Sequence, residues 1–319
     1  TQGTLIETVS NLAGNFTFQT IPYSAPGTHY YLVKEVVGIL GGVTYDQSLY
    51  LVKVHVADNG SGALVATVSY KKAAAAGASW AQTDKIAFTN SYQAAGTQVI
   101  LDGSKSLNGR TLADGEFQFE LYDSDSNGTE VNLRQTVANS GGSFSFTPIN
   151  YTAAGDYYYL IKEVAGTLGG VTYDQSRYLI KVEVTDDGLG ALSKEVIYKI
   201  AATGGGWATV EAIGFTNSYQ TTGTQVILDG SKTMIGRTLD DQEFEFNLYE
   251  STIAGTEGNW LQTVENFLGG FAFTPIAYTE TGTHYYLIKE VVGSLGGVTY
   301  DLNHFLVKVE VTDNGLGSL

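Results

Sequence analysis

Cysteine is absent from this 319-residue sequence, and basic residues are scarce. The absence of cysteine excludes disulfide bonds and thiolate metal sites. Lys and Arg number 17 against 33 Asp and Glu, which gives a formal net charge of −16. This excess of negative charge argues against nucleic acid as a partner, because no basic surface is available to neutralise phosphates.

Long apolar runs are absent as well. None approaches the roughly 18–20 residues that a membrane-spanning helix needs, so we predict no membrane insertion of this segment. The four histidines form no i,i+4 pair. The Asp-Asn-Gly and Asp-Asp-Gly triplets at 58–60, 186–188 and 313–315 lack the regular spacing of oxygen ligands in a calcium loop. We therefore interpret these triplets as tight turns and predict neither a metal nor a cofactor.

Glycine and tyrosine are abundant, with 39 and 21 residues, whereas proline occurs four times. Short runs of Val, Tyr, Thr and Phe alternate with turns rich in Gly, Asn and Asp, a pattern typical of an all-β protein. No stretch has a convincing helical period. We therefore expect two packed antiparallel sheets, as in an Ig-like β-sandwich.

Internal repetition determines the domain organisation. Residues 98–105 (QVILDGSK) return at 225–232, and residues 88–92 (FTNSY) return at 215–219, each 127 positions later. A period of this length corresponds to a whole small domain, because solenoid units are much shorter.

Three tandem β-sandwich domains follow from this period. Residues 97–219 form the one complete repeat. Residues 1–93 form a partial repeat that lacks its first strands, and residues 223–319 form one that lacks its last strands. The connectors between the repeats are only a few residues long, and short connectors restrict the motion of neighbouring domains.

One carboxylate of the complete repeat falls where the strand pattern predicts an apolar side chain. Residues 157–164 (YYYLIKEV) have the composition of a β-strand, and alternation places Glu163 on the same face as Ile161. Burial of an unpaired charge is costly, so this glutamate requires a partner. The same strand recurs twice, with Glu35 and Glu290 at the equivalent position.

Two further polar residues fall on apolar faces of predicted strands. Lys105 shares its face with Leu101, and Asn217 shares its face with Phe215. Taken singly, each polar residue has an ordinary explanation: a lysine with a solvated head, an asparagine at a strand edge, or a glutamate in a buried ion pair. Because all three occur in one domain, we predict that they meet in its interior.

The chemistry of these three groups predicts a covalent bond. Desolvation lowers the pKa of a buried lysine, and the neutral amine is a nucleophile. A buried glutamate has a raised pKa, so Glu163 can polarise the Asn217 carboxamide as a neutral acid and carry a proton to the departing ammonia. The predicted product is an amide between Lys105 and Asn217. The protein performs this reaction once on itself, so we predict that it is not an enzyme for an external substrate.

The motifs around these residues are similar to a known family. In order along the chain they are Lys105, GRTL at 109–112, YLIKEV at 159–164, GVTYD at 170–174 and FTNSY at 215–219. The pattern resembles the streptococcal pilin isopeptide-linkage domain of Gram-positive pilus backbone proteins and long repetitive surface proteins. The resemblance implies a CnaB-like sandwich in which Lys105 supplies the amine, Asn217 the carboxamide and Glu163 the acid/base.

The resemblance also assigns acid/base glutamates to the two partial repeats, Glu35 and Glu290. The first repeat contains the asparagine, Asn90, without the lysine, and the third contains the lysine, Lys232, without the asparagine. Completion of either bond requires residues outside this sequence.

Two functions fit the sequence. The first is a structural subunit or shaft segment of an extracellular fibre, pilus or stalk on a bacterial cell surface, stabilised by autocatalytic Lys–Asn isopeptide bonds. Its partners are neighbouring repeats or copies of the same protein. The alternative is the repeat region of an adhesin that binds a host or environmental glycan or protein. Short, similar connectors favour the shaft, and the bond takes the place of the disulfides in other extracellular proteins.

Overall fold

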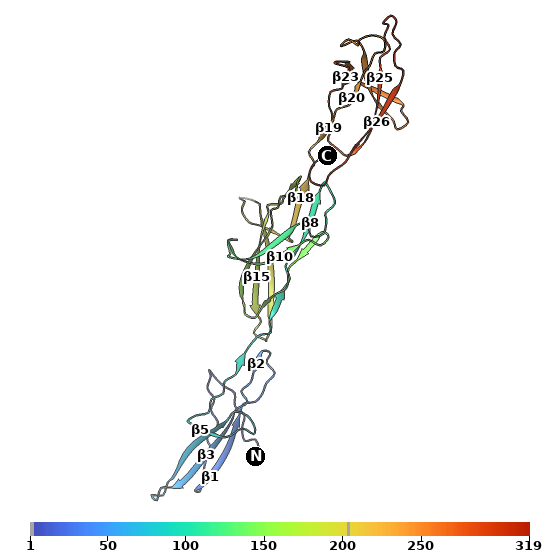
Figure 1. Ribbon diagram of the computed structural model, residues 1–319. Helices are drawn as coiled ribbons and strands as arrows, with labels where there is room; N and C mark the ends of the chain where they lie inside the picture. The colour runs from blue at the N-terminus through green and yellow to red at the C-terminus, as the bar shows by residue number, and fades with distance from the viewer. Residues whose placement is uncertain (1–2, 203–204) are drawn as a thin grey trace. The chain divides into compact units, whose positions relative to one another are not determined.

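The computed structural model describes residues 3–202 and 205–319, and over these residues the chain forms β-strands joined by turns, without α-helix (Figure 1). The predicted all-β class is therefore confirmed. Contacts divide the chain into two compact units. The first comprises Thr1–Val99, Pro148–Tyr157 and Val182–Val196. The second comprises Ile100–Thr147, Tyr158–Lys181 and Ile197–Leu319.

The first unit contains a four-stranded antiparallel sheet in the order β1-β3-β4-β5. Its strands are Gly27–Lys34 (β1), Leu49–Asp58 (β3), Leu64–Ala73 (β4) and Ala81–Thr83 (β5). Alternate residues of β3, namely Val52, Val54 and Val56, are buried and form a small apolar cluster. Four short strands form two further antiparallel pairs: Val43–Thr44 (β2) pairs with Ser91–Tyr92 (β6), and Thr97–Val99 (β7) pairs with Ile149–Tyr151 (β12).

Two sheets carry the three polar residues of the complete repeat. The smaller has the order β11-β8-β18-β14, with strands Ser143–Ser145 (β11), Asp102–Asn108 (β8), Gly214–Tyr219 (β18) and Val171–Thr172 (β14). The larger has the order β10-β9-β13-β15-β16-β17. Its strands are Glu130–Ala138 (β10), Gln118–Ser124 (β9), Gly155–Glu163 (β13), Arg177–Asp186 (β15), Leu192–Ala201 (β16) and Ala208–Val210 (β17).

Aromatic side chains fill the space between these two sheets. The ring of Phe119 in β9 stacks on that of Phe144 in β11, with centroids 3.8 Å apart, and lies 5.3 Å from the ring of Phe215 in β18. Gly103 in β8 leaves room for this packing, since an added Cβ would lie 2.5 Å from the ring of Phe144. The core therefore joins the smaller sheet, through β11 and β18, to the larger sheet.

Strands β8 and β18, which lie near the two ends of the complete repeat, pair in parallel, unlike the antiparallel pairs expected from the sequence. Lys105 lies opposite Phe215, and Asn217 lies opposite Leu107. A tight hairpin can join only antiparallel neighbours, whereas these two strands are separated by the whole domain and are free to run in the same direction. Figure 1 shows them side by side.

The C-terminal part of the second unit repeats this architecture. Its main sheet has the order β22-β21-β25-β26, formed by Glu257–Glu265 (β22), Glu245–Ser251 (β21), Gly282–Glu290 (β25) and His304–Val311 (β26). Shorter pairs join Thr224–Val226 (β19) to Ile276–Tyr278 (β24) and Asp229–Ser231 (β20) to Gly270–Ala272 (β23). Phe246 stacks on Phe271 with ring centroids 3.8 Å apart, as Phe119 stacks on Phe144.

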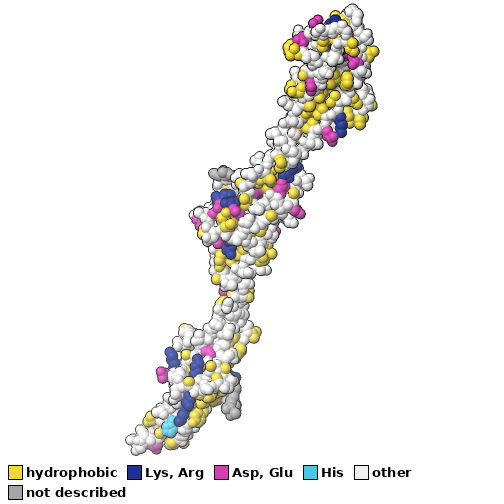
Figure 2. Space-filling view, in the orientation of Figure 1, with side chains coloured by type: hydrophobic (Ala, Val, Ile, Leu, Met, Phe, Trp, Pro, Cys, Tyr) yellow, Lys and Arg dark blue, Asp and Glu magenta, His cyan; other side chains and the backbone are white. Residues whose placement is uncertain are grey.

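Charged side chains of both signs lie beside one another on the visible face (Figure 2). Around β13, Lys162 pairs with Glu120 and Glu130, and Arg177 also reaches Glu130. Exposed pairs of this kind contribute little to stability. In the part of the chain that the structure describes, no helix is long and apolar enough to cross a membrane.

Candidate functional site

The structure brings Lys105, Glu163 and Asn217 together between the two sheets. Lys105 lies in the middle of β8, Asn217 lies in β18, and Glu163 is the last residue of β13. Lys105 Nζ is 2.9 Å from Glu163 Oε1 and 3.0 Å from Oε2. Asn217 Nδ2 donates a hydrogen bond to Glu163 Oε1 at 2.7 Å. One carboxylate therefore contacts both the amine and the carboxamide.

All three residues lie on the buried faces that strand alternation predicts. Lys105, Glu163 and Asn217 are 3%, 7% and 0% exposed. The ring of Phe117 lies 4.6 Å from Lys105 Nζ and covers the ammonium with an apolar face. Water is thus largely excluded from the cluster, and its charges interact more strongly than charges at the surface.

Burial moves the pKa values of the pair toward each other. Desolvation lowers the pKa of Lys105, and this effect is only partly opposed by the hydrogen bond and charge of Glu163. Desolvation also raises the pKa of Glu163, opposed by Lys105 and Asn217. Both directions favour transfer of a proton from the ammonium to the carboxylate, which leaves a neutral amine beside a neutral acid.

Asp174 positions the asparagine, a role that the sequence analysis missed. Its backbone N–H donates to Asn217 Oδ1 at 2.7 Å. Its carboxylate accepts hydrogen bonds from the backbone N–H groups of Thr216 and Ser176, both at 2.8 Å. The carboxamide is therefore held at both ends. Its oxygen faces a fixed N–H donor, at the place where negative charge develops when a nucleophile attacks the adjacent carbon.

The first repeat contains the same arrangement without a lysine. Asn90 Nδ2 donates to Glu35 Oε1 at 2.6 Å, and the backbone N–H of Asp46 donates to Asn90 Oδ1 at 2.8 Å. The other carboxylate oxygen, Glu35 Oε2, is buried and has no hydrogen-bond partner among the residues that the structure describes. In the complete site the equivalent oxygen of Glu163 accepts a hydrogen bond from Lys105.

The third repeat contains the lysine half of the site. Lys232 Nζ lies 2.8 Å from Glu290 Oε1 and 2.7 Å from Oε2, and 4.2 Å from the ring centroid of Phe244. Both carboxylate oxygens therefore contact a single ammonium. Across the three copies, the lysine and the asparagine each reach the glutamate whether or not the other is present.

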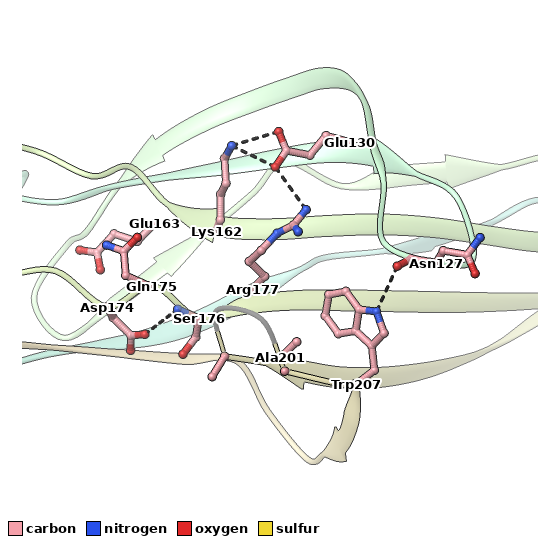
Figure 3. Close-up of a pocket in the computed structure, with 12 residues that line it drawn as sticks. Asn127, Glu130, Lys162, Glu163, Asp174, Gln175, Ser176, Arg177, Ala201 and Trp207 are labelled. Carbon is pink, nitrogen blue, oxygen red and sulfur yellow. Dashed lines mark hydrogen bonds and ion pairs between the residues drawn. The ribbon is translucent and has the colours of Figure 1, made fainter.

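A pocket of about 550 Å³ borders the complete site (Figure 3). Glu163 and Asp174 lie at one side of it, and Trp207, whose indole N–H donates to the Asn127 backbone oxygen at 3.0 Å, lies at the other. Of the three polar residues of the complete site, Glu163 lines this pocket, whereas Lys105 and Asn217 do not. Across residues 3–202 and 205–319, no group of three or more His, Cys, Asp or Glu side chains is placed to hold a metal ion.

The fold and this cluster define a class: tandem β-sandwich domains with a lysine, a glutamate and an asparagine buried together between the sheets. The chain matches the FctA family, the Spy0128-like isopeptide containing domain, over residues 1–93, 101–220 and 228–319. These matches cover most of its length, so the chain belongs to that family. The resemblance predicted from the motifs is therefore confirmed, while the repeat boundaries predicted from the sequence stay predictions.

Among solved structures, the chain is similar to major pilins of Streptococcus pyogenes. The T-13 major pilin is 16% identical, and the match covers 68% of this chain and 95% of that one with a TM-score of 0.29. The T3.2 major pilin is 14% identical, with coverages of 69% and 94% and a TM-score of 0.29. No curated protein matches the chain. These likenesses are too distant to assign a function.

Proposed function

We propose that the chain is a structural segment of an extracellular fibre, of the pilus or stalk kind, on a bacterial cell surface. In this proposal the complete repeat closes an isopeptide bond between Lys105 and Asn217 by its own chemistry. The observation that carries it is the buried contact of the Glu163 carboxylate with both reacting groups. Membership of the isopeptide-containing family supports it. Its partners are neighbouring repeats or further copies of the protein.

The geometry supports a direct acyl transfer. Glu163 accepts a proton from Lys105, and the neutral amine attacks the side-chain carbonyl carbon of Asn217. The backbone N–H of Asp174 stabilises the negative oxygen of the tetrahedral intermediate. Glu163 then gives a proton to the Asn217 nitrogen, the carbon–nitrogen bond to that group breaks, and ammonia leaves. The attacking nitrogen gives its extra proton to the Glu163 carboxylate as the new amide forms, so the reaction leaves Glu163 as a neutral acid. The reaction consumes both side chains, so it occurs once per repeat and turns over no external substrate.

The bond would stabilise the repeat in two ways. It removes a buried charge, whose desolvation is costly. It also closes a loop of roughly 110 residues, which in the chain-entropy model used for disulfides contributes about 4–5 kcal/mol. Intact-mass measurement tests the proposal, because each bond removes the mass of one ammonia from the chain.

Asp174→Ala is expected to slow bond formation by up to about 10²-fold without abolishing it, because a small misplacement of a reacting group has an effect of this size. The variant keeps the lysine, the glutamate and the asparagine but loses the carboxylate that holds the backbone of Thr216 and Ser176. The measurement is the fraction of freshly synthesised chain that has lost ammonia, followed over time.

The matched control is Asp301→Ala. Asp301 occupies the equivalent position in the third repeat and accepts a hydrogen bond from Asn303, but that repeat has no asparagine to position. Bond formation at wild-type rate in Asp174→Ala would contradict the positioning role, and slow formation in Asp301→Ala would indicate an effect unrelated to the site.

A further inference from the structure

Tyr92, at the end of the first FctA match, contacts a turn of the second match. Its hydroxyl donates to Asp186 Oδ1 at 2.7 Å and accepts from the backbone N–H of Gly190 at 3.2 Å. Backbone hydrogen bonds run alongside, from the Ala95 N–H to the Gly190 oxygen at 2.8 Å and from the Leu192 N–H to the Ala95 oxygen at 3.0 Å. All of these residues belong to the first compact unit.

The same contacts recur 127 residues later, within the second compact unit. The Tyr219 hydroxyl donates to Asp313 Oδ1 at 2.7 Å and accepts from the Gly317 N–H at 3.0 Å. The Thr222 N–H donates to the Gly317 oxygen at 2.8 Å. The guanidinium of Arg110 lies 4.8 Å from the Tyr219 ring centroid and packs over it. The contacts of the tyrosine hydroxyl with the aspartate and the glycine amide are thus common to both copies, whereas the arginine contact is given for Tyr219.

At the last glycine of these two turns, Gly190 and Gly317, another segment of backbone lies very close. A Cβ at Gly190 would lie 2.5 Å from the carbonyl carbon of Gly41 and from the nitrogen of Gly42. A Cβ at Gly317 would lie 2.7 Å from Gly170 Cα. Any side chain at either position would force the two segments apart.

The first copy of the turn, residues 58–62, forms without a tyrosine. The Gly60 N–H donates to Asp58 Oδ1 at 2.8 Å, the same bond that forms in the other two copies. An added Cβ at Gly62 would meet nothing within 4 Å, although its φ of +82° resembles those of its two counterparts. The conformation of the turn is therefore intrinsic to its sequence, and the tyrosine binds to a surface that is already formed.

We propose that the Asp-X-Gly-X-Gly turn of each repeat is a docking surface, and that its ligand is the tyrosine that closes an adjacent repeat of the same family. The tyrosine hydroxyl satisfies the aspartate as a donor and the glycine amide as an acceptor, which phenylalanine cannot do. Tyr219 lies two residues beyond Asn217, so docking fixes the strand that carries the carboxamide to the following repeat. The docking contacts do not depend on formation of the isopeptide bond.

Amide hydrogen exchange in the full chain, resolved by residue with NMR, tests this proposal. In the wild type, the amides of Gly190 and Gly317 are expected to exchange at least about tenfold more slowly than the amide of Gly62, because only they donate to a tyrosine. Tyr92→Phe is expected to accelerate exchange at Gly190 alone, and Tyr219→Phe at Gly317 alone.

Tyr30→Phe is the control, since Tyr30 is 61% exposed and makes neither contact; both amides should keep their protection. Equal exchange at the three glycines of the wild type, or unchanged exchange in both docking variants, would overturn the proposal. Gly190→Ala and Gly62→Ala provide a second test: both replace a glycine of positive φ, so only the docking contact makes Gly190→Ala the more destabilising. The docking variants should still lose ammonia, which separates failure of docking from failure of the isopeptide bond.

Discussion

The purified chain is expected to weigh one ammonia less than its amino-acid sequence predicts, because Lys105 and Asn217 contact the same buried carboxylate. Glu163→Ala should carry the full mass of its sequence, since it lacks the group that moves the protons. Lys105→Met and Asn217→Ala should do the same, because each lacks one of the reacting atoms. Mass spectrometry of the denatured chain measures the difference, and a branched tryptic peptide locates it.

Glu290→Gln is the matched control for this experiment. It removes an equivalent carboxylate that contacts a lysine, Lys232, in a repeat without the asparagine. Its mass should therefore show the same loss of one ammonia as the wild type. A wild-type mass equal to the uncorrected sequence would rule out the bond, and retention of the loss in Lys105→Met would place its origin elsewhere.

Asn217→Ala is expected to lower the free energy of unfolding of the complete repeat by about 4–5 kcal/mol, because it opens the loop that the bond closes. The ion pair of Lys105 and Glu163 stays in place, so no buried charge is left unpaired. Urea unfolding can be followed by the fluorescence of Trp207 in a chain in which the only other tryptophans, Trp80 and Trp260, are replaced by phenylalanine.

Asn90→Ala separates the covalent bond from the hydrogen bonds of the asparagine. Asn90 donates to Glu35 as Asn217 donates to Glu163, but within residues 3–202 and 205–319 no lysine contacts the free oxygen of Glu35. Its replacement should lower the stability of the first repeat by only about 2 kcal/mol, the net contribution of its two hydrogen bonds to Glu35 and Asp46. If the two asparagine variants lose the same stability, the bond contributes nothing measurable.

Strand alternation was enough to predict which side chains of the site are buried. Lys105, Glu163 and Asn217 each lie in a strand that has no bulge before the polar residue. Side chains therefore alternate between the two faces of the strand up to that residue. Gly103 is a position where a bulge could have shifted this parity, but it pairs regularly with Phe144. The glutamate on an apolar face recurs at the equivalent position of all three repeats, as Glu35, Glu163 and Glu290.

Other features could not be predicted from residue types. Asp174 contacts the Asn217 side chain through its backbone N–H, which every residue except proline has, and its carboxylate binds only backbone N–H groups. Only the recurrence of Tyr-Asp at 45–46, 173–174 and 300–301 marks the position in the sequence. Strand β10 cannot be recognised from a buried face, because it lies at a sheet edge and its Val131 and Leu133 side chains are 60% and 52% exposed. Its apolar residues therefore do not indicate a buried face.

The parallel pairing of β8 and β18 determines how the complete repeat resists a pull on its two ends. Such a pull draws β8 by its N-terminal end and β18 by its C-terminal end, so the neighbouring strands are sheared along their length in opposite directions. In this geometry the hydrogen bonds between Gly214–Ser218 and Ser104–Asn108 must fail together, whereas a hairpin pulled open from one end loses them in succession. The proposed amide spans the same two strands, so it would stop the extension at this first step.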